Sequence, residues 1–314
     1  MDRPYNEVQI KDTSEIQDMK TEKCILPSRL DEIPLSVMRC MPDDGIQVKG
    51  IVQIAHGMCG SKERYIPVMS YMSARGIACV AHDHRGHGES VTSQDDLGYF
   101  HTGGWKGIVD DILIVNEHIR SLHPGIPFFL FGHSMGSLAV RSFTKRYDTI
   151  INGLIVCGSP SRNPATGAGR MLARVIASIK GDRHRPSLIH KIAFENFNSR
   201  FVSEGENAWL STDRTIVKEY NDDPLCGYMF TANGFTGLFD LMLDTYSDKG
   251  WNVHNPSLPI HFIAGADDPC ITSCKDFDKA VGHIRSVGYA KVTSRLYEGM
   301  RHEILNETGK TVVY

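Results

Sequence analysis

The chain has 314 residues, of which 41% are hydrophobic and 23% charged, and this composition excludes a mainly disordered protein. Its 34 lysines and arginines are nearly balanced by 37 aspartates and glutamates, so no basic excess indicates a nucleic acid partner. The polar N-terminal segment lacks the apolar stretch of a secretory signal, and no apolar run is long enough to form a transmembrane span. The eight cysteines are scattered without a C-x-x-C pair, which indicates neither a disulfide scaffold nor a zinc ribbon. We therefore expect a cytoplasmic globular protein, built as one large domain with an insertion.

Short apolar runs alternate with helical patterns, which is typical of a mainly parallel sheet covered by helices. Two early runs, at residues 24–26 and 35–41, are predicted to form an antiparallel hairpin at one edge. Later strands are predicted at residues 51–55, 77–81, 127–131, 153–156, 260–264 and 292–297. Before the third of these strands, one helix face is indicated by the spacing of Trp105, Ile108, Val109, Ile112, Asn116 and Ile119. A further helix is predicted to start at Leu138 and to carry Phe143.

Residues 161–256 break this alternation, because they contain no convincing strand but two helical patterns. The two apolar stripes consist of Leu172, Val175, Ile176 and Ile179, and of Phe235, Leu238, Phe239, Met242 and Tyr246. We expect this insertion to form a helical cap over the carboxyl edge of the sheet, where open α/β sheets bind their ligands. The core would then comprise residues 1–160 and 257–314. The alternative is an ordinary helical layer.

A G-x-S-x-G motif runs from Gly132 to Gly136, after an apolar run and before a predicted helix. Between a strand and a helix, this motif forms a sharp turn that presents the serine hydroxyl at the strand tip. The helix start behind it favours developing negative charge. We therefore predict Ser134 as a nucleophile, against the simpler interpretation of a glycine-rich turn.

A serine hydroxyl needs a neighbouring base to act as a nucleophile. His302 is the candidate among 14 histidines, because it follows the last predicted strand and should lie at the same edge as Ser134. The competing interpretation is a surface histidine between Arg301 and Glu303. An acid that orients the imidazole is expected between serine and histidine in the chain, and the residues leave both Asp267 and Asp268 as candidates.

The oxyanion of an acyl-transfer intermediate needs two backbone N–H donors. Met135, directly after the predicted nucleophile, should supply one of them. The turn that follows the 51–55 strand begins with His56 and Gly57, and we assign its Met58 N–H as the second donor. No cofactor and no metal are predicted.

A second motif, residues 82–88, has the sequence HDHRGHG and resembles a dinuclear metal signature, H-x-H-x-D-H. Gly86 stands where that signature needs an aspartate, which argues against a metal site. The simpler interpretation is a loop in which Asp83 and Arg85 tie the strand end to its surroundings.

These motifs, together with the DHRGHGES stretch at residues 83–90 and the RHE stretch at residues 301–303, resemble α/β-hydrolases of the monoglyceride lipase/lysophospholipase branch. Serine aminopeptidases such as proline iminopeptidases are near relatives. The resemblance covers about residues 52–307 and keeps the order of all motifs. It implies an eight-stranded, mostly parallel sheet flanked by helices, with a helical cap. It also implies that the acid is Asp268, three residues after Gly265.

The resemblance implies a serine esterase that cleaves carboxylic esters, with monoacylglycerol or a lysophospholipid as the expected substrate. Tentative acyl-chain contacts in the cap are Leu172, Ile176, Phe235, Phe239 and Met242, although each could simply pack the cap on the sheet. The basic residues Arg170, Arg174 and Lys180 are expected to form a solvated helix face, and the alternative is transient contact with an anionic membrane surface. The alternatives are a small-ester carboxylesterase, an aminopeptidase that uses Glu204, Glu206 or Glu219 to hold an α-amine, and a binding protein without turnover.

Overall fold

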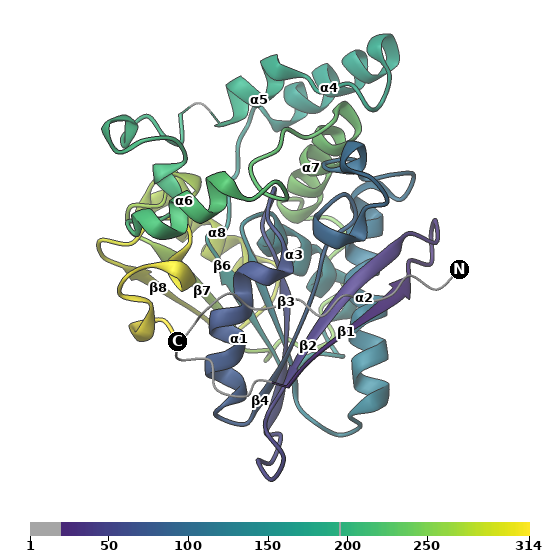
Figure 1. Ribbon diagram of the computed structural model, residues 1–314, viewed down its shortest axis with the longest axis vertical. Coiled ribbons are helices and arrows are strands. Elements are labelled where there is room, and N and C mark those ends of the chain that lie inside the picture. The colour runs from purple at the N-terminus through teal and green to yellow at the C-terminus, as the bar shows by residue number, and fades with distance from the viewer. Residues whose placement is uncertain (1–19, 195) are drawn as a thin grey trace.

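The computed structural model describes residues 20–194 and 196–314, and an eight-stranded sheet forms its centre (Figure 1). The strand order is β1-β2-β4-β3-β5-β6-β7-β8. The strands are β1 Lys20–Pro27, β2 Pro34–Met41, β3 Gly50–Ala55, β4 Ile77–His82, β5 Phe128–His133, β6 Gly153–Cys157, β7 Ile260–Gly265 and β8 Val292–Tyr297. The β1–β2 and β2–β4 pairs are antiparallel and the other neighbouring pairs are parallel. The predicted α/β-hydrolase sheet and its edge hairpin are confirmed.

The predicted strands are found, but the range predicted for β5, residues 127–131, begins one residue too early and ends two residues too early. It begins at Phe128 and continues to His133, because Gly132 and His133 still pair with Val156 and Cys157 of β6. Ser134 therefore follows the last paired residue of β5 directly. This extension carries the sheet up to the motif that holds the candidate nucleophile.

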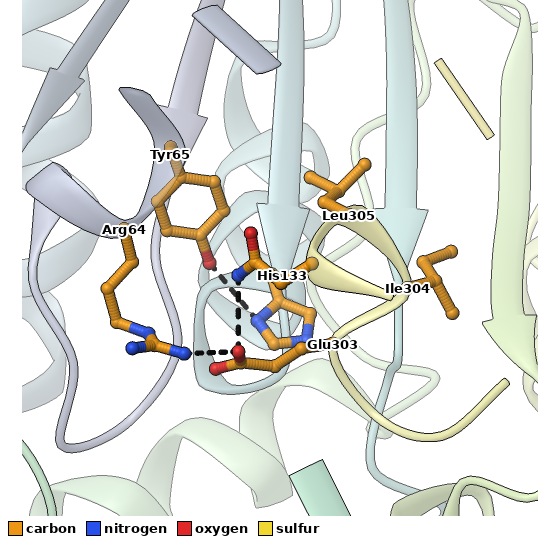
Figure 2. A pocket seen from close by; sticks show the side chains of 7 residues that line it. Arg64, Tyr65, His133, Glu303, Ile304 and Leu305 are labelled. Carbon is orange, nitrogen blue, oxygen red and sulfur yellow. Dashed lines mark hydrogen bonds and ion pairs between the residues drawn. The ribbon is translucent and has the colours of Figure 1, made fainter. Parts of the chain in front are cut away.

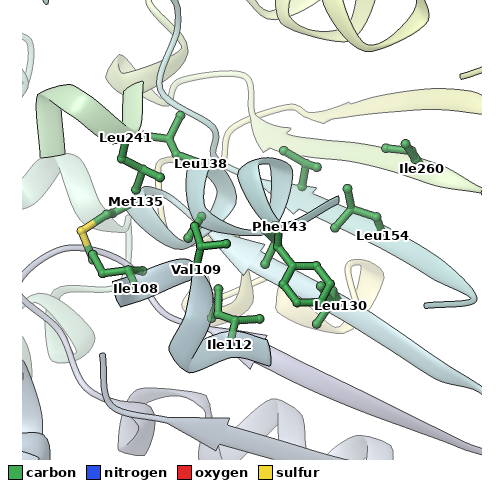
Figure 3. Close-up of a cluster of buried hydrophobic side chains, with 14 of the residues drawn as sticks. Ile108, Val109, Ile112, Leu130, Met135, Leu138, Phe143, Leu154, Leu241 and Ile260 are labelled. Atoms are coloured by element: carbon green, nitrogen blue, oxygen red, sulfur yellow. The ribbon is translucent and has the colours of Figure 1, made fainter. Parts of the chain in front are cut away.

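Helices cover both faces of the sheet, and the sheet divides the apolar core into two layers. Along β5, Phe128 and Leu130 belong to one layer, and Phe131 belongs to the other. The first layer packs under α2 Gly104–Leu122, α3 Met135–Tyr147 and α8 Cys274–Ser286; the second packs under α1 Ile66–Ser73. Figure 3 shows Ile108, Val109 and Ile112 of α2 beside Met135, Leu138 and Phe143 of α3 in the first layer. The predicted apolar face of α2 is thus confirmed.

The insertion between β6 and β7 is helical, and its described residues contain no strand. It carries α4 Thr166–Lys180, α5 Ser187–Phe194, α6 Arg214–Asp222 and α7 Ala232–Thr245. The sequence indicated only α4 and α7, because α5 is one short helix and α6 is polar with a single buried residue, Tyr220. In Figure 1, α4 and α5 form the outermost layer at the top of the molecule, and α7 lies nearer the sheet. We keep residues 161–256 as the proposed cap.

The proposed cap is packed unevenly. Helix α7 contacts α2 and α3 of the core as well as α4, and Thr231 caps its start by accepting from the Gly234 N–H at 3.1 Å. Helix α4 buries only Thr166 and Ala173, so much of its predicted apolar stripe faces outward. Within the described chain, no helix combines the length and apolar character needed to cross a bilayer.

Candidate active site

Ser134 lies in a sharp turn between β5 and α3, and its backbone has a conformation that residues other than glycine rarely adopt. Its φ is 54° and its ψ is −119°, a strained combination that costs about 1–3 kcal/mol unless surrounding contacts hold it. Two hydrogen bonds do so: the Ser134 N–H donates to the Cys157 carbonyl at 2.9 Å, and the Ser137 hydroxyl donates to the Ser134 carbonyl at 2.5 Å. The observed strain is that of a nucleophile elbow.

The two glycines of the motif allow close approach of the backbones around Ser134. A Cβ atom at Gly136 would collide with the Ala55 carbonyl oxygen at the end of β3. A Cβ at Gly132 would lie only 2.5 Å from the Gly136 carbonyl oxygen and from a methyl group of Val140. The motif therefore fixes the helix start against the ends of two strands, as the sequence pattern predicts.

The structure brings His302 and Asp268 together at the ends of β8 and β7. The Nδ1 atom of His302 lies 2.9 Å and 3.0 Å from the two carboxylate oxygens of Asp268. Both side chains are buried, and the Cys270 N–H donates a further hydrogen bond of 2.8 Å to the carboxylate. Asp267 instead points outward and accepts from Arg200 at 3.0 Å. Of the two aspartates that the residues left open, Asp268 is therefore the one beside His302.

The hydrogen bond to Asp268 sets the tautomer of His302. Because Nδ1 donates to the carboxylate, Nε2 carries the free lone pair of the neutral ring. Nε2 lies 3.9 Å from the Cys270 sulfur, and within the described chain no hydrogen bond joins it to the Ser134 hydroxyl. Ser134, Cys270 and His302 all line the same cavity. Hydrogen bonds between a nucleophile and its base are often long until substrate binds, so this arrangement is compatible with catalysis.

The turn after β3 lies directly against Ser134. A Cβ at Gly57 would lie 3.1 Å from the Cβ of Ser134, and Met58 lines the cavity. Cys59 has a positive φ of 53°, and the turn is held by two contacts with the proposed cap. The Cys59 thiol donates to the Tyr228 carbonyl at 2.8 Å, and the Gly227 N–H donates to the Cys59 carbonyl at 3.1 Å. The turn is thus placed where the sequence predicts an oxyanion donor.

A buried network behind His302 was not predicted from the sequence. The Tyr65 hydroxyl lies 3.1 Å from Nδ1 of His133 (Figure 2). Nε2 of His133 lies 3.1 Å from the His302 carbonyl. Burial lowers the pKa of His133 to about 4, so the neutral ring donates to that carbonyl through Nε2 and accepts from Tyr65 through Nδ1. Arg64 pairs with Glu303 in the same place. Tyr65 is 68 residues from His133, and no local pattern signals a contact at that distance.

The proposed cap also contacts the His302 loop. The Glu303 N–H donates to the Leu210 carbonyl at 2.7 Å, and the Trp209 ring lies 5.0 Å from the His302 ring. Arg301 reaches into the cap, where it donates to the Ala208 carbonyl at 2.7 Å. The sequence showed Arg301 only as a neighbour of the histidine and gave no signal for these contacts.

A cavity of about 790 Å³ lies between the sheet edge and the cap. Its wall includes Leu172, Phe239 and Met242 of the five predicted acyl-chain contacts. Ile176 and Phe235 are not among the lining residues: Ile176 packs on the main core, and Phe235 is fully buried with its ring 5.9 Å from that of Phe230. The prediction that Ile176 and Phe235 contact an acyl chain in this cavity is therefore not supported by their positions.

The HDHRGHG motif forms a buried loop held by ion pairs. Asp83 accepts from the backbone N–H of Lys62 at 2.8 Å and from its ammonium at 2.7 Å. Arg85 donates to both carboxylate oxygens of Asp111, at 2.9 Å and 3.0 Å, and to Asp31 at 2.9 Å. The loop thus has the structural role that the simpler interpretation gave it.

Two groups in the described chain bring three metal-ligand side chains together, and neither includes His82, His84 or His87. The first consists of Glu63, Asp83 and Glu89, and the second of Asp268, Cys270 and His302. The Lys62 ammonium lies 2.7–2.9 Å from all three carboxylates of the first group. Burial opposes the charge on Lys62, but Asp83 and Glu63 raise its pKa above the ordinary value. A cation of the protein itself therefore already balances that group.

Comparison with known proteins identifies the family of this chain. Residues 46–309 match the protein family described as serine aminopeptidase, S33. The chain belongs to this family. A monoacylglycerol lipase of Mycolicibacterium smegmatis is 26% identical over 272 residues, which cover 84% of this chain and 85% of the relative.

Solved structures show the same fold. A carboxyl esterase of Bacillus coagulans superposes with a TM-score of 0.83 at 22% identity and covers 92% of this chain and 93% of its own. A monoglyceride lipase of Saccharomyces cerevisiae gives a TM-score of 0.70 at 18% identity, with 95% of this chain and 94% of its own covered. This serine aminopeptidase family member is an α/β-hydrolase of the monoglyceride lipase branch and a carboxylic ester hydrolase.

Proposed function

We propose that this hydrolase cleaves monoacylglycerols or lysophospholipids through an acyl-enzyme formed on Ser134. The observation that carries the proposal is the cavity of about 790 Å³, whose wall holds Ser134 and His302 beside apolar side chains such as Leu172, Phe239 and Met242. A volume of this size is in the range that encloses a ligand of drug-like size, ~300–1,000 Å³. The relative from Mycolicibacterium smegmatis is named a monoacylglycerol lipase, which supports the first of these two substrates.

In the proposed mechanism, Ser134 attacks the ester carbonyl while Nε2 of His302 takes the hydroxyl proton. Asp268 keeps the proton of the resting imidazole on Nδ1 and stabilises the imidazolium that forms. The Met58 and Met135 N–H groups are assigned to the oxyanion. The imidazolium then protonates the leaving alcohol, and water repeats the sequence to release the fatty acid.

The acyl chain is proposed to lie along the apolar wall between α4 and α7. Each methylene that leaves water there contributes about 0.8 kcal/mol, so a cavity that accepts a long chain discriminates strongly against a short one. Polar side chains on the same wall, including Asn163, His190 and Asn198, could bind the glycerol or phosphate headgroup.

The aminopeptidase alternative needs carboxylates that hold a free α-amine. Of the three that the sequence offers, Glu206 lines the cavity, Glu204 is paired with Arg301 at 2.6 Å, and Glu219 is not a lining residue. A single available carboxylate beside a mostly apolar wall favours an ester of a fatty acid over a peptide.

The test compares a long-chain 1-monoacylglycerol, lysophosphatidylcholine and a prolyl arylamide, with Ser134→Ala as the control. We expect fatty acid from at least one lipid, no amine from the arylamide, and loss of turnover by several orders of magnitude in the variant. Amine release with inert lipids would move the enzyme to the peptidase class. Ester turnover that survives Ser134→Ala would overturn the assignment of the nucleophile.

A further inference from the structure

Asp268, Cys270 and His302 bring three possible metal-ligand side chains together, and ester hydrolysis does not need the sulfur of Cys270. Cys270 is buried, lines the cavity and presents its sulfur 3.9 Å from Nε2 of His302. Nε2 is the nitrogen whose lone pair the proposed mechanism needs as a base. A cysteine thiolate, formed when the thiol loses its proton, and an unprotonated imidazole nitrogen are two donor types that zinc prefers.

We propose that Cys270 and His302 form an inhibitory zinc site inside the catalytic centre. A zinc ion bound there takes the lone pair of Nε2, so His302 can no longer accept the proton of Ser134. This inference rests on the proposed function for its effect on turnover, but the binding of zinc can be measured without turnover.

The distance between the two donors suits a tetrahedral ion. With Zn–S and Zn–N bonds of about 2.3 Å and 2.1 Å, an ideal tetrahedral angle separates sulfur and nitrogen by about 3.6 Å. The observed separation of 3.9 Å corresponds to an angle of about 125° at such an ion, a modest distortion of the tetrahedron. A linear ion with the same bond lengths would need the donors about 4.4 Å apart, so the geometry favours zinc over two-coordinate ions.

His302 has the hydrogen-bond partner that zinc-binding histidines usually have. Zinc-binding histidines usually donate their other ring N–H to a carboxylate, which fixes the tautomer and raises the basicity of the ligating nitrogen. Asp268 accepts from Nδ1 of His302 in this way, at 2.9 Å and 3.0 Å. The carboxylate also contributes negative charge close to the proposed ion. Cys270, His302 and Ser134 line the same cavity, so water or the Ser134 hydroxyl is available to complete the coordination.

Binding of zinc exchanges a proton for the metal. Burial raises the pKa of the Cys270 thiol, and Asp268 adds to the effect, so the sulfur enters as S–H. The S–H bond breaks, a Zn–S bond forms and the proton passes to the buffer, with no change in oxidation state.

The first experiment measures ester turnover against free zinc in the wild type, Cys270→Ala and Cys274→Ala. Cys274 is the matched control, because it is an exposed thiol four residues along the chain and does not line the cavity. We expect wild type and Cys274→Ala to lose turnover with the same zinc dependence and to recover it with a chelator. Cys270→Ala should need at least about tenfold more zinc, whatever its own turnover, because even indirect metal partners are worth ~10–100-fold in affinity. Equal sensitivity of all three proteins would overturn the proposal.

The second experiment measures zinc binding by calorimetry in Ser134→Ala, which keeps both proposed ligands but cannot turn over substrate. We expect one zinc to bind with release of protons, and binding to weaken at least about tenfold when Cys270→Ala or His302→Ala is added. Co²⁺ in place of zinc should give a thiolate charge-transfer band that Cys270→Ala removes and Cys274→Ala keeps. Unchanged binding in Cys270→Ala, with thermal unfolding showing a folded protein, would exclude the site. Because these measurements need no substrate, their failure is distinguishable from a failure of the esterase proposal.

Discussion

The carboxyl edge of the sheet and the outer helix of the cap are built in opposite ways. At the sheet edge, Asp268 and His302 are 3% and 2% exposed, and each is held by hydrogen bonds to neighbouring loops. On α4, by contrast, Met171 is 68% exposed and Ile179 is 75% exposed, and the helix packs mainly on α7. We propose that the chemistry depends on the buried sheet edge, whereas access and substrate choice depend on the more exposed helices of the cap. The predictions below separate these two roles.

The largest effect is expected at the acid of the sheet edge. Asp268→Asn should lower kcat/KM for an ester by ~10⁴, because an amide in place of the carboxylate no longer favours the tautomer with the proton on Nδ1. Steady-state kinetics on a soluble ester measures the effect. Asp267→Asn is the matched control and should change the rate little, since Asp267 pairs with Arg200 on the surface. A larger loss at Asp267 than at Asp268 would contradict the assignment.

Glycine substitutions should show the same contrast in stability. Gly136→Ala forces a Cβ into the Ala55 carbonyl, so we expect a loss of about 3 kcal/mol or more in the free energy of unfolding, together with loss of turnover. Gly167→Ala on α4 meets open space and should leave stability unchanged or raise it by up to about 1 kcal/mol. Urea unfolding of the two variants measures both effects. A tolerated Gly136→Ala would show that the elbow is less tightly packed than its contacts indicate.

Acid should destabilise the sheet edge through its buried histidines. Burial lowers the pKa of His56 and of His82 from 6.5 to about 3, so both rings stay neutral in the folded protein at pH values where the unfolded chain binds protons. Above pH 6.5 these rings are neutral in both states and do not lower the free energy of unfolding. As the pH falls from 6.5 towards 3, each ring lowers that free energy by about 1.4 kcal/mol per pH unit. Denaturant titrations at pH 7, 6 and 5 should therefore give falling unfolding free energies. A constant value over this range would mean that these rings are solvated in the folded state.

Two phenylalanines on α7 allow a test within the cap itself. Phe239→Ala should lower kcat/KM for long-chain esters by about ten- to hundredfold relative to short ones, because the removed ring lines the cavity. Phe235→Ala, one turn earlier, should instead cost about 3–5 kcal/mol of stability and leave the chain-length preference alone, since that ring is buried in the core. Rates on esters of increasing chain length, with thermal unfolding alongside, distinguish the two. A shared loss of preference would mean that the cavity wall is wrongly assigned.

The sequence predicted the parts of the site whose signal is local. Ser134 lies in a five-residue motif, and His302 follows a strand, so their common edge could be inferred from the alternation of strands and helices. The choice of Asp268 over Asp267 depends on which carboxylate faces a histidine 34 residues away, and only family resemblance indicated it. Contacts such as Tyr65 with His133 leave no periodic pattern in the chain.

The cap was predicted less well for a different physical reason. The stripe on α4 has the spacing of a buried face, but burial depends on what packs against it, and Val175 and Ile179 are exposed. Ile176 and Phe235 have the residue type of a lipid contact, yet neither lines the cavity. Apolar character at helical spacing indicates that a side chain leaves water in some state of the protein, and it does not indicate which surface covers it.

The smallest effect on the isolated enzyme is expected for Met171→Ser combined with Ile179→Ser. Both side chains are exposed and neither lines the cavity, so the unfolding free energy should change by no more than about 0.5 kcal/mol per site, and turnover of a short soluble ester should be unchanged. We propose that the exposed apolar face of α4 makes transient contact with the lipid surface that supplies the substrate. Turnover of monoacylglycerol in vesicles should then fall while the soluble activity is kept, because less apolar area enters the interface. Equal loss on both substrates would place α4 in the structure of the catalytic site, and equal retention would assign its exposed face no part in lipid capture.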